Sequence, residues 1–179
     1  MIIAGIGSRE TPPDILALMT QIGAWAKKNQ FLIYSGHADG ADWAFEQGAQ
    51  DFCGVFLPWN TFNKHLVSQA TKYVLPPDEE SIAITRKFHP AFDKLSEAAL
   101  KMMCRNAHQV LGIYLNNPVD VVICWTKDGK ATGGTGQALR IAEYYKIPIV
   151  NLYYPEKVVE IKKIIEEDIW QNEEEKQKI

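Results

Sequence analysis

The chain has 179 residues, of which 46% are hydrophobic and 23% charged, proportions that are ordinary for a globular protein. This length suffices for one domain with a full core. The 19 basic and 22 acidic residues give a formal net charge of −3, which argues against a broad nucleic-acid-binding face but not against one basic pocket. The three cysteines and four histidines show no metal-ligand spacing, so we expect no metal site.

The sequence shows no targeting or membrane-spanning signal. Its first residues lack a cationic segment followed by a cleavage site, and no apolar run approaches the length of a membrane span. The scattered cysteines are typical of a reducing compartment, in which they pack as small apolar side chains. We therefore expect a cytoplasmic protein that contacts no membrane.

Strand and helix patterns alternate along the chain. Short apolar runs predict strands, and the stretches between them carry apolar residues at helical spacing. The expected strands cover residues 2–7, 31–35, 53–57, 119–125 and 148–152, and the expected helices cover 14–29, 41–50, 81–87, 91–115, 133–145 and 156–179. This order predicts an α/β, Rossmann-like, doubly wound and mostly parallel sheet in a single domain.

Two segments depart from the alternation. Between about 56 and 104 lies an aromatic and basic insertion, in which Trp59 or Phe62 could offer a flat face to a base or could pack onto the core. The core is then expected over residues 1–155, followed by a C-terminal helix and a charged, fraying tail over 156–179. This last helix carries more apolar residues than one stripe needs, so we expect a homodimer or a higher homo-oligomer. The residues in question are Ile161, Ile164, Ile165, Ile169 and Trp170.

A glycine-rich turn follows the strand expected at 119–125 and opens a helix. Glycines at such a junction let backbone N–H groups approach an anion, and the helix N-terminus adds partial positive charge. The alternative is a tight turn without a ligand. The candidate phosphate-binding residues are Gly133, Gly134, Thr135, Gly136 and Gln137.

Polar residues also follow the first two expected strands, in the runs Gly7-Ser8-Arg9 and Ser35-Gly36-His37-Ala38-Asp39-Gly40-Ala41-Asp42. The guanidinium of Arg9 can make forked bonds to a phosphate or a carboxylate. The carboxylates of Asp39 and Asp42 can accept from hydroxyl groups or can cap a helix. Because the carboxyl ends of parallel strands meet at one edge, these junctions predict a single site there. Arg105 and Asn106, a polar pair inside a helical pattern, indicate either a polar pocket or solvent exposure.

Taken in order, these motifs resemble the Rossmann-like core of the DNA-processing DprA (Smf) family, within the SLOG superfamily that also holds the LOG proteins. The matching residues, spread over roughly 1–152, are Gly7-Ser8-Arg9, Ser35-Gly36-x-Ala38-x-Gly40-x-Asp42, Arg105-Asn106 with Leu111-Gly112, and Gly133-Gly134. The chain resembles a stand-alone core of this type, which phages and bacteria both encode. The resemblance implies that the site binds a nucleotide or a nucleotide-derived ligand.

The expected roles follow from that resemblance. Arg9 and the turn at 133–136 would hold phosphate, Asp42 a ribose hydroxyl, and Trp59 or Phe62 a base, with Arg105 and Asn106 completing a polar wall. In LOG enzymes, which release a base from a nucleoside monophosphate, a glutamate occupies the position of Arg140. A cation there cannot act as a general base at neutral pH, so we expect binding without turnover and no required cofactor.

Three functions therefore stay open. The leading one is sequestration of a nucleotide derivative, such as a signalling nucleotide, in the host cytoplasm if the source is a phage. The second is a LOG-type hydrolase that cleaves an N-glycosidic or phosphate bond, for which Asp39 and Asp42 are the available acid/base groups. The third is a DprA-like module that binds single-stranded DNA. Because the net charge is negative, we do not expect DNA binding.

Overall fold

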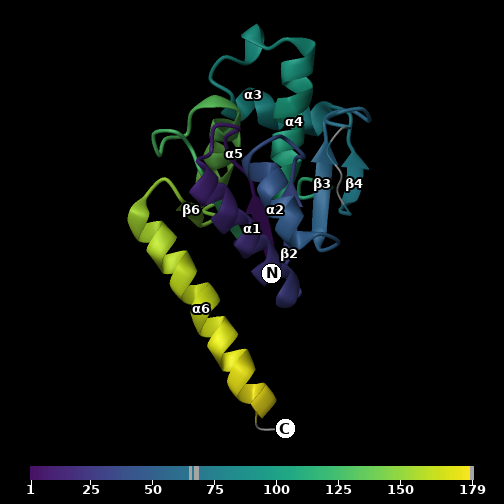
Figure 1. The fold of residues 1–179 in the computed structure, drawn as a ribbon. Helices are drawn as coiled ribbons and strands as arrows, with labels where there is room; N and C mark the ends of the chain where they lie inside the picture. Colours follow the sequence, from purple (N-terminus) through teal and green to yellow (C-terminus); the bar gives the residue numbers. More distant parts are fainter. Residues whose placement is uncertain (65, 67–68, 178–179) are drawn as a thin grey trace.

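Six parallel strands form a single sheet in the order β4-β3-β2-β1-β5-β6 (Figure 1). The computed structural model describes residues 1–64, 66 and 69–177, with side chains as far as residue 168. The strands are β1 (Ile2–Gly5), β2 (Leu32–Ser35), β3 (Cys53–Leu57), β4 (Thr71–Val74), β5 (Val121–Cys124) and β6 (Ile149–Asn151). The chain winds outward from β1 to β4 and then places β5 and β6 on the other side of β1, so the switch point lies between β1 and β5. The predicted α/β, Rossmann-like, single-domain class is confirmed.

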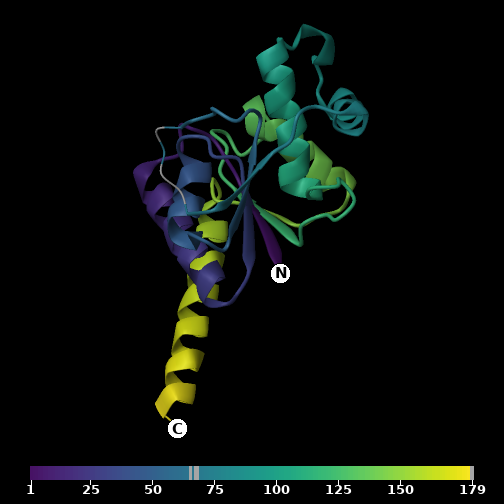
Figure 2. The same cartoon turned by 90° about the vertical axis from the view of Figure 1, so that its right-hand side faces the viewer.

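Helices cover both faces of the sheet, which Figure 2 shows nearly edge-on between the two layers. They are α1 (Pro13–Lys28), α2 (Ala41–Ala49), α3 (Glu79–Phe88), the 3₁₀ turn η1 (Phe92–Lys94), α4 (Glu97–Leu111), α5 (Gly133–Tyr144) and α6 (Pro155–Gln177). Alternate strand residues face the two layers. Ile3 and Ile33 lie in the cluster with α1 and α2, whereas Ala4 and Tyr34 lie in the cluster with α4 and α5.

The helices α1 and α2 touch backbone to backbone. Gly23 on α1 and Gly48 on α2 face each other's helix, and a Cβ at Gly23 would collide with the carbonyl of Phe45, while one at Gly48 would collide with that of Thr20. Leu18 and Ile22, at helical spacing on α1, are buried in the core. This close packing holds the C-terminal half of α2 against α1.

The strand β4 was not predicted from the sequence. It pairs with β3 at the end of the sheet, and Thr71, Lys72 and Val74 are exposed on it. An edge strand that is largely exposed lacks the continuous apolar run of a buried parallel strand, so the usual pattern is absent. The segment expected to be a loop therefore lengthens the sheet by one strand.

The helix expected over 91–115 is also interrupted. The turn η1 ends at Lys94, and α4 begins at Glu97 after Ser96, whose Oγ accepts from Ala99 N at 3.2 Å. A serine in this position caps a new helix rather than continuing an old one. The helix α4 then ends at Leu111 before Gly112, whose φ is +80°.

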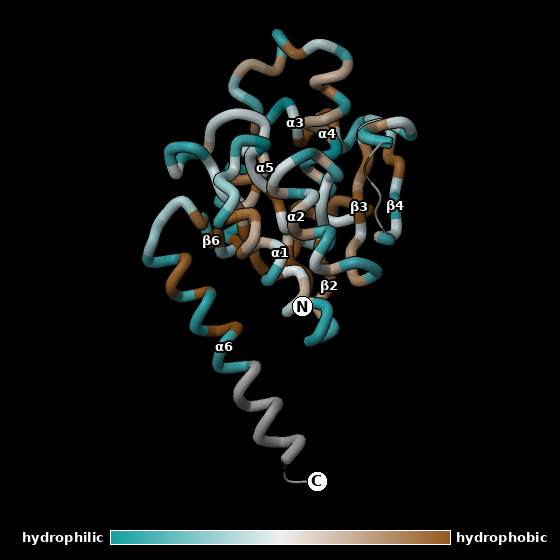
Figure 3. The backbone as a smooth tube through the Cα atoms, in the orientation of Figure 1, coloured by the Kyte–Doolittle hydropathy of each residue, from teal (hydrophilic) through white to brown (hydrophobic). Residues whose placement is uncertain are grey.

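The last helix, α6, runs from the carboxyl edge of the sheet past the N-terminus and away from the body (Figure 1). Its early turns pack through Ile161, which is buried, while Val159 and Ile164 are exposed. Figure 3 shows hydrophobic residues concentrated in the strands, with a mixed pattern along α6. The side chains of Ile169 and Trp170 lie outside the described ones, and a single chain does not test the expected homo-oligomer. No helix in the described ranges has the length and apolar composition needed to cross a membrane.

Candidate ligand pocket at the carboxyl edge

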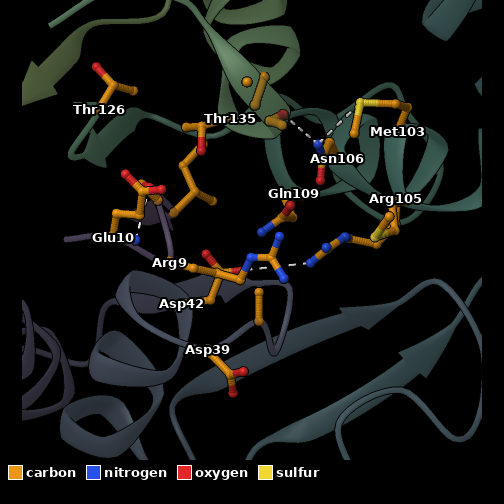
Figure 4. A pocket seen from close by; sticks show the side chains of 18 of the residues that line it. Arg9, Glu10, Asp39, Asp42, Met103, Arg105, Asn106, Gln109, Thr126 and Thr135 are labelled. Atoms are coloured by element: carbon orange, nitrogen blue, oxygen red, sulfur yellow. Dashed lines mark hydrogen bonds and ion pairs between the residues drawn. The ribbon is translucent and has the colours of Figure 1, made fainter. Parts of the chain in front are cut away.

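A pocket of about 590 Å³ opens at the carboxyl edge of the sheet, next to the switch point. Its walls come from the loops after β1, β2, β3 and β5, from α4, and from the first turn of α5. Figure 4 shows Arg9 and Arg105 extending towards its middle from opposite sides. Polar groups from separated parts of the chain thus converge where an open α/β sheet binds its ligands.

The loop after β1 is held tightly behind Arg9. Ser8 N donates to the carbonyl of Trp125 at 3.1 Å, and the carbonyl of Ser8 accepts from Thr11 Oγ1 at 2.7 Å. Gly40 packs against this loop, with a φ of +84° and a hypothetical Cβ only 2.8 Å from the Cα of Arg9. The exposed Arg9 side chain therefore projects from a fixed backbone, and Gly40 is required both for its conformation and for the close approach.

The loop after β2 rests on a buried histidine–glutamate pair. His37 Nδ1 lies 2.7 Å from Glu46 Oε2, and Glu46 Oε1 accepts from His37 N and from Ser35 Oγ, each at 3.0 Å. His37 has a φ of +60°, and its carbonyl accepts from Asn63 Nδ2 at 2.8 Å. This pair ties the β2 loop to the β3 loop, and it gives Ser35 a structural partner below the pocket.

Arg105 and Asp42 form an ion pair on the pocket wall. Arg105 Nη1 lies 3.5 Å from Asp42 Oδ2, and both residues are 5% exposed. Burial raises the pKa of Asp42 to about 6, a shift that the nearby Arg105 charge opposes. Burial likewise lowers the pKa of Arg105. The Arg105 guanidinium occupies the space that a Cβ on Gly36 would need, so only a glycine at position 36 leaves room for this side chain.

Two buried donors in this wall lack a hydrogen-bond partner among the described residues. They are Arg105 Nε and Gln109 Nε2, which lie one helical turn apart on α4. An unsatisfied buried donor costs about 1–3 kcal/mol, so these two groups favour a ligand that brings acceptors to them. Sequence reasoning did not single out Gln109 as a site residue. The i, i+4 spacing from Arg105 was the available signal.

The first turn of α5 presents open backbone N–H groups. Its N-cap, Thr132, makes no side-chain capping bond, and the first turn carries no acidic residue. Asn106 Nδ2 donates to the carbonyl of Gly134 at 2.9 Å and so holds the turn in place. A Cβ on Gly133 would meet nothing within 4 Å, and one on Gly134 only a methionine methyl group at 3.9 Å. The space in front of this positive helix end is therefore open to an anion.

Ten of the predicted site residues line this pocket: Gly7, Ser8, Arg9, Asp39, Asp42, Arg105, Asn106, Gly133, Gly134 and Thr135. Ser35 and Gly36 lie behind it. Gln137 turns away, because its Nε2 donates to the carbonyl of Met103 at 2.9 Å, and a Cβ on Gly136 would collide with the carbonyl of Ala131.

The aromatic pair and the LOG-like position also differ from expectation. Phe62 lines the pocket, but Trp59 is not part of the lining and packs edge-on against Phe62 with ring centroids 5.2 Å apart. Arg140 does not line it either. Its guanidinium donates to the carbonyls of Phe88 and Ala131 at 2.6 and 2.8 Å. The sequence analysis also missed Asn63, Thr126 and Lys127 in the lining.

Neither family models nor curated proteins give a match to this chain. Among solved structures, DNA processing protein A from Helicobacter pylori, described for its unique single-stranded DNA binding mode, is similar with a TM-score of 0.55. The two sequences are 17% identical, and the alignment covers 96% of this chain and 81% of that chain. The comparison supports the expected DprA-like core at the level of the fold.

The expectation that the chain does not bind DNA is therefore corrected, because the similar structure belongs to a protein that binds single-stranded DNA. The net charge was a poor guide. Residues 155–179 hold five lysines and eight acidic residues, so the whole excess of −3 lies in this segment, and residues 1–154 hold 14 residues of each sign. Because residues 1–154 are neutral as a whole, the net charge of the chain gives no reason to exclude a nucleic acid from the carboxyl edge.

Proposed function

We propose that the pocket binds one nucleotide unit of single-stranded DNA, with a backbone phosphate held between Arg9 and the first turn of α5. Arg9 supplies an exposed guanidinium fork, and the helix end supplies N–H groups and partial positive charge. The similarity in fold to a protein that binds single-stranded DNA supports this occupant over others.

The observation that carries the proposal is the set of unsatisfied donors around one cavity. Arg105 Nε and Gln109 Nε2 are buried and have no partner among the described residues, while the N-terminus of α5 is uncapped. These two side-chain donors and the N–H groups at the start of α5 obtain hydrogen-bond acceptors only from a bound ligand. A nucleotide carries acceptors both on its phosphate and on its base and sugar, so it can satisfy the two ends of the pocket together.

Titration of a 5′-labelled thymidine 20-mer by fluorescence anisotropy tests this proposal. The wild-type chain should bind, and Arg9→Ala should weaken binding about tenfold or more because a charge-assisted hydrogen bond is lost. The matched control is Arg86→Ala, an exposed arginine on α3 outside the pocket lining. Absence of binding by the wild-type chain, or an equal loss in the two variants, would contradict the proposal.

A free nucleotide derivative is the second candidate. The favouring observation is the size of the pocket, since about 590 Å³ lies within the range of small-molecule sites. In that case a mononucleotide should bind as tightly as the 20-mer. An affinity that increases with oligonucleotide length favours the single strand instead. The resemblance to the SLOG superfamily and a phage source stay predictions under either occupant.

We propose binding without turnover for both candidates. Arg140, which holds the position of the LOG glutamate, is engaged with two backbone carbonyls outside the pocket. Asp42 is paired with Arg105 in a buried wall, an arrangement that fixes the carboxylate rather than leaving it to transfer protons. Unchanged nucleoside monophosphate after prolonged incubation with the protein is the expected outcome, and release of free base would contradict it.

A further inference from the structure

Two adjacent tyrosines, Tyr153 and Tyr154, come one residue after the end of β6, at the same edge of the sheet as the pocket. Tyr153 and Tyr154 are 42% and 41% exposed, and their rings stand almost perpendicular with centroids 5.3 Å apart. Neither residue lines the pocket. What sets this pair apart from other exposed aromatic residues is its place at the carboxyl edge, where open α/β sheets bind their ligands.

A buried asparagine fixes these tyrosines to the loop after β5. Asn151, which is 6% exposed, donates through Nδ2 to Thr126 Oγ1 at 2.8 Å and to the carbonyl of Gly129 at 3.3 Å. Its Oδ1 accepts from Thr126 N at 3.3 Å and from Tyr153 N at 3.1 Å. One amide group thereby joins the tyrosine segment and the β5 loop into a single unit.

The tyrosine rings also pack on that loop. Tyr154 OH donates to the carbonyl of Gly129 at 3.4 Å, and a Cβ on Gly129 would lie 2.6 Å from this hydroxyl oxygen and 2.8 Å from Tyr153 Cδ1. Thr126 and Lys127, which belong to the same loop, line the pocket. The tyrosine pair is therefore next to the pocket rim. The same loop carries two exposed cations, Lys130 and Lys127, of which Lys127 forms an ion pair with Glu10 Oε2 at 3.1 Å.

We propose that Tyr153 and Tyr154 form a second contact site, on which a base next to the nucleotide in the pocket stacks. This inference rests on the proposed function. Sites for single strands combine cations that follow the backbone with aromatic rings on which successive bases stack, and the β5 loop brings both together. A free mononucleotide that fills the pocket would leave the tyrosines uncovered, so the pair selects a strand rather than a single nucleotide.

The chain offers a matched control for the test. Tyr144 and Tyr145 are also adjacent and exposed, at 58% and 43%, with ring centroids 5.2 Å apart. They stand at the end of α5, whose first turn lines the pocket, and so lie one helix length from it. The double variants Tyr153→Ala/Tyr154→Ala and Tyr144→Ala/Tyr145→Ala remove the same groups from the two places.

Binding of thymidine monophosphate and of a thymidine 12-mer is measured for each chain by calorimetry. The Tyr153→Ala/Tyr154→Ala variant should bind the 12-mer about fivefold or more weakly, the loss expected when one base–aromatic stack is removed. Its affinity for the monophosphate should stay within twofold of wild type, and the control variant should match wild type for both. Tyr154→Phe, which keeps the ring and removes only the hydroxyl, should bind the 12-mer as tightly as the wild-type chain does.

The outcomes separate this inference from the function on which it rests. If the wild-type chain binds the 12-mer and the variant binds it equally well, the tyrosine site is wrong and the pocket stands. If the variant loses both ligands, or if the two double variants lose 12-mer binding equally, the effect is general and the tyrosine site is again wrong. If the wild-type chain binds neither ligand, the proposed function itself fails, and this inference with it.

Discussion

Arg9 and Arg105 carry the same charge but differ in surroundings. Arg9 is exposed on a loop, whereas Arg105 is 5% exposed and faces Asp42 at 3.5 Å. An exposed guanidinium without an ion-pair partner attracts an incoming anion through its charge. A buried guanidinium that is already paired with a carboxylate contributes mainly hydrogen bonds that orient the ligand. We therefore assign phosphate binding to Arg9 and placement of the ligand to Arg105.

The state of Asp42 should make binding depend on pH. Burial raises the pKa of this carboxyl to about 6, so below pH 6 it becomes neutral and leaves the charge of Arg105 uncompensated. Affinity for a thymidine oligonucleotide should then increase as the pH falls from 7.5 to 5.5. Anisotropy titrations across this range check the trend. Asp42→Asn should flatten it, and an equal slope in this variant would assign the dependence to another group.

The same shift has a consequence for stability. Because the pKa of Asp42 is higher in the folded protein than its ordinary value of 3.8, the folded state binds this proton more readily than the unfolded chain. The stabilising contribution of this carboxyl is therefore complete below about pH 4 and is lost as the pH rises through 6. Urea unfolding should show a shallower decline over this range for Asp42→Asn than for the wild-type chain.

Some site residues could be predicted from the sequence, and others could not, for a geometric reason. Residues at the ends of β1 and β2 were found because parallel strands place their carboxyl ends together. Which side of a helix faces the pocket was harder to predict. Gln137 turns towards α4, while Gln109, one turn after Arg105, faces the cavity. Which side of each helix faces the pocket depends on how α4 and α5 pack together. The spacing of residues along the sequence carries no information about that packing.

At the scale of single elements, the first turn of α5 does two things at once. Its glycines keep side chains away from the helix end, and the missing cap leaves N–H groups for a ligand. Both features weaken the helix, because glycine is a poor helix former and an uncapped end leaves donors unsatisfied. A sequence that gives up local stability at one helix end indicates that the end has another use.

Gly134→Asp should therefore change stability and binding in opposite directions. A carboxylate in the first turn interacts favourably with the helix dipole and should raise the free energy of unfolding by about 0.3–1 kcal/mol. The same charge should repel a phosphate and abolish oligonucleotide binding. Thermal melts and anisotropy titrations measure the two effects separately.

The control for that variant is Gly134→Ala. An added methyl group meets only a methionine methyl at 3.9 Å, so it should stabilise the helix and leave oligonucleotide binding close to wild type. If Gly134→Asp binds normally, the phosphate lies elsewhere.

Elements with a clear pattern of hydrophobic residues were predicted well. The expected strand over 53–57 matches β3 at both ends, since it is an unbroken buried run. The exposed edge strand β4 was missed, and the helix expected over 91–115 was divided at Ser96. The strand β4 forms because it pairs with β3, and α4 begins where Ser96 caps it. Neither feature is visible in the periodicity of hydrophobic residues.

At the scale of the whole molecule, charge is unevenly distributed. The acidic excess belongs to residues 155–179, while the pocket lining contains three cations, Arg9, Arg105 and Lys127, and three carboxylates. The net charge of the chain therefore reflects the C-terminal segment and not the charges around the pocket. The expectation that the chain does not bind DNA rested on this net charge and not on the charges at the carboxyl edge.

The same distribution predicts a weak dependence of DNA binding on salt. Each phosphate neutralised on a single strand contributes about 0.7 to the slope of log affinity against log salt, so the three cations of the pocket lining together with Lys130 allow a slope of about −3 at most. Titrations of the 20-mer between low and physiological salt give this slope. A much steeper value would require a basic surface that the carboxyl edge does not provide.

A crystal structure of the chain with a short thymidine oligonucleotide tests the central claim most directly. The account predicts a backbone phosphate within hydrogen-bond distance of the Arg9 guanidinium and of the backbone N–H groups at Gly134 and Thr135. It also predicts an acceptor of the same nucleotide at Arg105 Nε or Gln109 Nε2. An oligonucleotide bound elsewhere on the chain, with this pocket left to solvent, would contradict the account.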